Sequence, residues 1–200
     1  MSTSDPRPVR RFSSEYELRA AAVTAANFAC NGDAGRVLGD PVFDSVTEGR
    51  ATWKQYSACG DLAQYVLKEV GVRDEHIVNR NDDGGTVPWK IGANLSDIVY
   101  RTGNAFIWAK PELRPKPGDI LYLAAPEHVC VLEAINEDAA TIATFDYGQF
   151  NYAVGKPSGK RCVHAFAARV GGLRVGARVL RGWLDISKLP GLLPSPTAIV

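Results

Sequence analysis

The sequence has almost no net charge, few histidines and no paired cysteine motif. Its 23 lysine and arginine residues stand against 22 aspartate and glutamate residues, which leaves a formal net charge of +1 at pH 7. This balance gives no bulk field to attract nucleic acid or a membrane surface, so we expect neither as a partner. With 3 histidines and 4 widely spaced cysteines, none in a CxxC pair, we expect no structural zinc site and no cofactor.

The N-terminal segment also lacks the apolar stretch of a secretory signal peptide, and no apolar run approaches the length of a membrane span. We expect the protein to be cytoplasmic as synthesised, with export by a non-classical or specialised secretion system as the alternative. The chain is long enough for one sizeable core. We expect a flexible arm over residues 1–13, one domain over residues 14–189 and a proline-rich tail over residues 190–200.

Helical patterns come first along the chain and strand patterns follow. Ser14 and Glu17 form a possible capping box for a helix that ends near Cys30, and apolar residues recur at helical spacing from Cys59 to Val70. Strand patterns bounded by turn residues cover 120–125, 128–135, 141–148, 161–170 and 177–186. This order predicts an α+β fold with helices segregated against an antiparallel sheet.

Three residues combine into a candidate catalytic site. Cys59 stands at the start of the second helix, where backbone N–H groups and the helix dipole favour a thiolate. His128 opens an apolar strand and can act as its base. If the segment 136–140 is the turn of a hairpin, the residues opposite His128 lie near 146–149, and Asp146 is the carboxylate among them that can orient the imidazole.

The segments "SACGDLAQYVLKEVG", "PKPGDILYL" and "EHVCVLEAINEDAATIATFDYG" resemble motifs of the CHAP and NlpC/P60 branches of the papain-like cysteine peptidases and amidases. The resemblance covers roughly residues 55–149. It implies a papain-like architecture for the domain at 14–189, with Cys59 as nucleophile, His128 as base and then acid, and Asp146 as orienter. It also implies cleavage of an amide bond in peptidoglycan, the substrate of many members.

Several assignments around this triad stay open. Tyr147 or Gln149 replaces Asp146 as third member if the hairpin register slips by a residue or more. The backbone N–H of Cys59 and the side chain of Gln55 or Tyr56 are candidate oxyanion donors. Trp89 lies in a polar, turn-rich segment suited to a substrate groove.

Each residue also has a purely structural interpretation. Cys59 suits a buried core thiol, His128 a strand-end histidine bonded to backbone, and Asp146 a turn cap. Cys130 shares the strand face of His128, and we assign it to core packing. Cys162 and His164 alternate in the same way in a later strand, but two ligands without a partner do not make a metal site.

The sequence therefore favours a cysteine-dependent peptidoglycan amidase or endopeptidase without a metal. An antibacterial effector delivered by a specialised secretion system is one route to such a substrate, and it would have an immunity protein as a partner. The alternatives are a deamidase or transglutaminase-like effector acting on a protein, and an inactive binding module.

Overall fold

The structure of the protein, a computed structural model, describes residues 12–31, 59–72, 79–80, 86–87, 105–124, 128–151, 156–189 and 191–194. The helical elements given by the structure are α1 (Glu15–Asn31), α4 (Cys59–Glu69) and the short 3₁₀ helix η2 (Ile186–Lys188). The strands are β1 (Asn79–Arg80), β2 (Thr86–Val87), β3 (Phe106–Trp108), β4 (Ile120–Ala124), β5 (His128–Asn136), β6 (Thr141–Asn151), β7 (Lys156–Arg169), β8 (Gly172–Val175) and β9 (Arg178–Leu184). Both predicted helices and all five predicted strands, now β4, β5, β6, β7 and β9, are confirmed.

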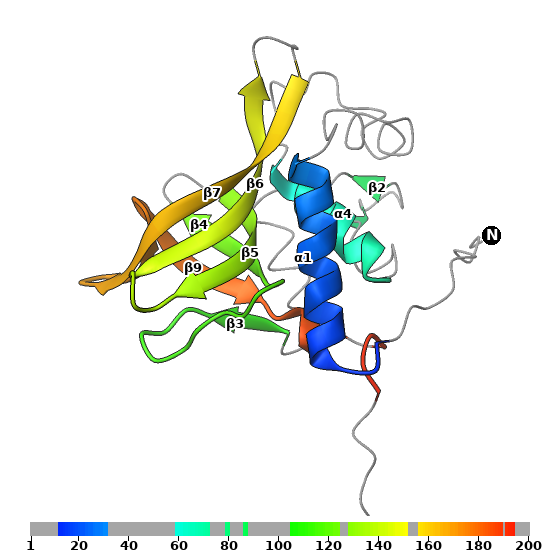
Figure 1. Ribbon diagram of the computed structural model, residues 1–200, viewed down its shortest axis with the longest axis horizontal. Helices are drawn as coiled ribbons and strands as arrows, with labels where there is room; N and C mark the ends of the chain where they lie inside the picture. Colours follow the sequence, from blue (N-terminus) through cyan, green and yellow to red (C-terminus); the bar gives the residue numbers. More distant parts are fainter. Residues whose placement is uncertain are drawn as a thin grey trace, which may run out of the picture.

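Strands β3 to β9 form one antiparallel sheet that closes on itself. The order is β3-β9-β4-β5-β6-β7-β8, and β8 pairs in addition with β9, where Arg174 lies opposite Val179 and Val175 opposite Arg178. Strands β4 to β9 therefore make a closed six-stranded barrel, seen beside α1 in Figure 1. Strand β3 adds to the other end of β9, where Trp108 lies opposite Gly182.

The predicted papain-like α+β architecture of the CHAP or NlpC/P60 type, with N-terminal helices packed on a sheet, is wrong. The closed barrel overturns it, and the closing contact is made by β8, which has only four residues. The strand begins at Gly172, the second of two adjacent glycines with positive φ, at 93° for Gly171 and 118° for Gly172. A strand of four residues that begins with a glycine is too short for an alternating strand pattern to be recognised in the sequence.

Alternate residues of the barrel strands serve two different cores, because successive side chains of a strand point to opposite faces. The barrel interior is filled by residues from all six strands: Leu121, Leu123, Cys130, Leu132, Ile142, Phe166, Leu173, Val175, Leu180 and Trp183. The residues between them, such as Val129, Val131 and Phe145, join α1 and α4 in a second core, the helix-side core. Its helical members include Leu18, Leu62 and Val66, all of them fully buried.

Helix α1 begins at a cap that the sequence predicted. The hydroxyl of Ser14 accepts the backbone N–H of Glu17 at 3.2 Å. The Glu17 carboxylate turns to Ser13, accepting its backbone N–H at 3.1 Å and its hydroxyl at 2.7 Å. The cap satisfies backbone donors that the first turn of a helix leaves without intrahelical partners.

The proline-glycine-aspartate turn before β4 holds α1 to the barrel through Arg19. The Arg19 guanidinium donates to Asp119 at 2.6 Å, to Asp185 at 2.7 Å and to the Pro117 carbonyl at 3.0 Å. At Gly118, where φ is +89°, an added Cβ would come within 3.2 Å of the Ala22 Cβ on α1. This motif, one of the three behind the family resemblance, thus has a structural role in the barrel.

The two ends of the described chain meet beside α1. The Phe12 N–H donates to the Leu192 carbonyl at 2.9 Å, and both side chains are buried in the helix-side core. Phe12 and Leu192 lie outside the predicted domain limits of 14 and 189, and they still take part in the packing of the helix-side core. In the described part of the chain, no helix is both long enough and apolar enough to span a membrane.

Candidate functional site

Cys59 is the first residue of α4, as the sequence predicted. The helix buries one face, including Leu62, Ala63 and Val66, in the helix-side core. Its C-terminus is closed by Gly71, with φ at 90° and its N–H bonded to the Lys68 carbonyl at 2.9 Å. This packing fixes the position of Cys59 next to the barrel, where its side chain is 1% exposed.

His128 is the first residue of β5 and lies opposite Leu123 of β4. It is 5% exposed, and its Nε2 lies 2.7 Å from Oδ1 of Asp146. The imidazole also makes a side-chain hydrogen bond with Cys59. The structure therefore brings Cys59, His128 and Asp146 together in one connected chain of hydrogen bonds.

Asp146 reaches His128 diagonally across the β5–β6 hairpin. The predicted hairpin is present, and its register places Asp146 directly opposite Cys130, two residues beyond His128. A register shift between Leu132 and Ala134 sets this alignment. Asp146 is 3% exposed, and its second oxygen, Oδ2, accepts a short hydrogen bond from the Thr144 hydroxyl. The carboxylate is thus held at both oxygens.

Burial disfavours the charged forms of His128 and Asp146, but the hydrogen bonds of the triad favour these forms and outweigh burial. Burial alone would lower the pKa of His128, but the hydrogen bonds with Asp146 and Cys59 raise this pKa to about 9. Burial would raise the pKa of Asp146, but its hydrogen bonds with His128 and Thr144 bring this pKa below its ordinary value. An imidazole that is hydrogen-bonded to a thiol and oriented by a carboxylate is the arrangement that cysteine-dependent hydrolysis uses.

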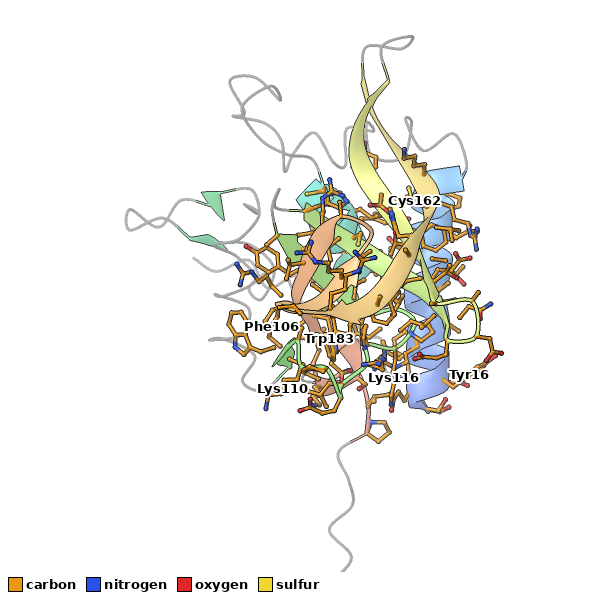
Figure 2. The ribbon with its side chains drawn as sticks, turned by 90° about the vertical axis from the view of Figure 1, so that its left-hand side faces the viewer. Tyr16, Phe106, Lys110, Lys116, Cys162 and Trp183 are labelled. Atoms are coloured by element: carbon orange, nitrogen blue, oxygen red, sulfur yellow. The ribbon has the colours of Figure 1, made fainter. Side chains whose placement is uncertain are left out.

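Other metal-ligand side chains surround Asp146 on the same face of the sheet. Cys162 and His164 of β7 lie opposite Thr144 and Ile142 of β6. The Nε2 of His164 is 3.8 Å from Oδ2 of Asp146. The position of Cys162 on β7 can be followed in Figure 2. The rejection of a metal pair at Cys162 and His164 assumed that no third ligand was near, whereas Asp146 lies beside both.

Among the remaining predicted site residues, the structure describes the side chain of Tyr147 alone. Gln55, Tyr56 and Trp89 lie outside the described residues. Tyr147 is 4% exposed and belongs to the helix-side core, on the face of β6 opposite to Asp146. Gln149 lies in β6 opposite Ser158, and its side chain is not described.

Sequence reasoning missed Thr144 as a partner of the triad. The signal was present, because Thr144 and Asp146 are two residues apart on one strand and so share a face.

Comparison of the chain with models of protein families, with curated proteins and with solved structures finds no match.

Proposed function

We propose that this protein is a cysteine-dependent amide hydrolase with Cys59 as nucleophile, His128 as general base and acid, and Asp146 as the group that orients His128. The observation that carries the proposal is the hydrogen-bonded series from thiol to imidazole to carboxylate, with 2.7 Å between Nε2 of His128 and Oδ1 of Asp146. The three residues come from α4, β5 and β6, so their meeting depends on the tertiary structure. The proposal rests on this geometry and not on a papain-like fold.

The chemistry follows from the roles that the geometry allows. His128 takes the proton of the Cys59 thiol, the sulfur attacks the amide carbonyl carbon, and His128 delivers that proton to the nitrogen as the carbon–nitrogen bond breaks. The amine leaves and a thioester remains on Cys59. His128 then takes a proton from water, the resulting hydroxide attacks the thioester carbon, and the sulfur leaves. Asp146 keeps the imidazole in one orientation throughout.

Peptidoglycan is the substrate that we propose, at an amide bond in its stem peptide or at the junction of peptide and glycan. This choice rests on the resemblance of the sequence motifs to cell-wall amidases and endopeptidases. Purified sacculi digested with the full chain are expected to release new muropeptides, identified by mass spectrometry. The Cys59→Ala variant should release none.

Cys30 of α1 provides a matched control, since it is a second buried thiol, 7% exposed, whose sulfur contacts the backbone carbonyl of Asp146 at 3.8 Å rather than its carboxylate. A folded Cys30→Ala variant should keep most of the activity. Equal hydrolysis by the wild-type and Cys59→Ala proteins would contradict the proposal.

A thiol-reactive probe tests the chemistry without a chosen substrate. Because Cys59 is 1% exposed, labelling requires both a reactive sulfur and a path to it. We expect an electrophilic probe to modify Cys59 faster than Cys130, and His128→Ala to slow this reaction. Equal labelling of the two thiols would favour a binding module with a structural cysteine. Release of ammonia from protein glutamine without hydrolysis of sacculi would instead indicate a deamidase.

A further inference from the structure

Asp146 has a second group of neighbours that the proposed mechanism does not use. A ligand atom of each of Asp146, Cys162 and His164 lies within 4.8 Å of the other two. The carboxylate approaches this group with Oδ2, which accepts the Thr144 hydroxyl and is also 3.8 Å from Nε2 of His164, while Oδ1 is taken by His128. The two oxygens of one carboxylate thus face two different sets of side chains.

The strand geometry brings these three ligands together. Cys162 and His164 are two residues apart on β7, so both side chains lie on one face of the strand. Their partners on β6 are Thr144 and Ile142, and Asp146 follows Thr144 on the same face. Side chains opposite or diagonal to one another on antiparallel strands are within reach of a common ion.

We propose that Asp146, Cys162 and His164 bind a divalent transition metal of the Zn²⁺ type, which links β6 to β7. A thiolate, an imidazole and a carboxylate are the three ligand types that Zn²⁺ takes in proteins, and its tetrahedral geometry leaves a fourth position for water. The thiolate and the carboxylate together neutralise the charge of the ion. On binding, the Cys162 thiol loses its proton to solvent, and no oxidation or reduction takes place.

This set is a better metal site than the overlapping one formed by His128, Cys130 and Asp146. Cys130 is 1% exposed, and His128 already shares a hydrogen bond with Asp146. Cys162 and His164 are only partly buried, and the His164 side chain is 26% exposed, so an ion can reach them from solvent. The site therefore goes beyond the proposed hydrolase and does not require it.

Co²⁺ is the probe for this site, because its thiolate complexes absorb through sulfur-to-metal charge transfer. The full chain, first treated with a chelator and kept in a non-thiol reductant, is titrated with Co²⁺ and then with Zn²⁺. We expect one charge-transfer band that saturates at one equivalent of Co²⁺ and is removed by Zn²⁺. His164→Ala is expected to lower the affinity for Co²⁺ by at least about tenfold, and Cys162→Ser to abolish the band.

The Cys59→Ala variant is the matched control, since it loses the thiol that is hydrogen-bonded to His128 but keeps all three proposed ligands. It should retain the band and the affinity of the wild-type protein. This readout is independent of catalysis, so a failure of the hydrolase proposal leaves it unchanged. A second readout is the melting temperature, which Zn²⁺ should raise in the wild-type protein and raise less in His164→Ala at the same Zn²⁺ concentration.

Three results would overturn the proposed site. One is the absence of a charge-transfer band at saturating Co²⁺. Another is unchanged affinity in both His164→Ala and Cys162→Ser. The third is a band that survives Cys162→Ser but is lost in Cys130→Ser, which would place the ion in the overlapping set.

Discussion

Thr144 is the residue whose role can be tested most sharply, because it touches the triad only through Asp146. It is fully buried, and its hydroxyl donates to Oδ2 of Asp146. Replacing the hydroxyl by a methyl group of similar size leaves that oxygen without its partner, at a cost of about 1–3 kcal/mol. The carboxylate then holds His128 less well, so Thr144 is a positioning residue.

We predict that Thr144→Val lowers kcat by about 5–150-fold, the kinetic equivalent of that cost, and leaves KM nearly unchanged. Thr144→Ser keeps the hydroxyl and should recover most of the activity. Both variants are assayed by initial rates over a range of substrate concentrations, after circular dichroism has shown that they fold. A loss of activity in Thr144→Ser equal to that in Thr144→Val would show that the methyl group matters and the hydroxyl does not.

The sequence could predict the three members of the candidate site better than their surroundings. Cys59 and His128 are at element boundaries marked by a helix start and a strand start, and the hairpin turn placed Asp146 within reach of His128. The bulge between Leu132 and Ala134 decides the register, and no single residue type encodes it. Cys162 and His164 could not be joined to Asp146 from the sequence, because the β6–β7 pairing that aligns them was not predicted.

At the scale of elements, the attachment of α1 to the barrel depends on one cation between two carboxylates. The Arg19 side chain is 9% exposed and contacts Asp119, which is 1% exposed, and Asp185. Removing Arg19 leaves two buried or partly buried carboxylates without their cation. Breaking one partner out of a buried ion pair costs far more than the pair itself contributes.

We predict that Arg19→Leu lowers the free energy of unfolding by about 3–5 kcal/mol. The control is Lys116→Ala, which removes an exposed ion pair of 3.0 Å between Lys116 and Glu15 and should cost less than about 1 kcal/mol. Urea denaturation of both variants measures the two values. Similar losses in the two variants would show that burial of the Arg19 pair has no special effect.

The close packing of β3 against β9 requires a glycine at position 182, because there is no room for a Cβ atom. A Cβ at this position would lie 2.5 Å from the Ile107 carbonyl oxygen and 2.6 Å from the Phe106 ring. A backbone atom cannot move aside as the end of a flexible side chain can. Strand β3 would therefore have to shift away from β9.

We predict that Gly182→Ala costs about 1–3 kcal/mol and increases hydrogen exchange at the β3 amides. Arg181→Ala, a change at the exposed neighbouring residue, should alter stability by less than about 0.5 kcal/mol. Chemical denaturation and hydrogen-exchange mass spectrometry give the two readouts. Unchanged exchange in β3 would mean that the strand can accept the methyl group without moving.

At the scale of the whole molecule, local patterns predicted most strands but not their closure. Each of the five predicted strands carries its own alternating or apolar run, so it could be recognised alone. Closure depends on the pairing of β8 with β9 through only two residue pairs. A pairing between segments is a property of the folded chain, and the same run of strands can lie in an open sheet or a barrel.

The barrel interior makes the six strands one cooperative unit, because every strand contributes at least one side chain to this shared interior. Trp183 of β9 is the largest of them, is 2% exposed and lies among residues from the other strands (Figure 2). We predict that Trp183→Ala lowers the free energy of unfolding by about 3–5 kcal/mol, by loss of burial and creation of a cavity. Because the interior is shared, unfolding should stay a single transition.

Trp108 is the matched control, since it lies on the added strand β3, outside the barrel, and is 60% exposed. Its ring meets Phe106 edge-on with centroids 5.0 Å apart, so Trp108→Ala should cost no more than about 1.5 kcal/mol. Guanidinium titrations followed by far-ultraviolet circular dichroism and by tryptophan fluorescence measure both variants. If Trp183→Ala lost no more stability than Trp108→Ala, or if its two probes gave separate transitions, the six strands would not share one interior, and the closed barrel would have to be abandoned as the basis of this fold.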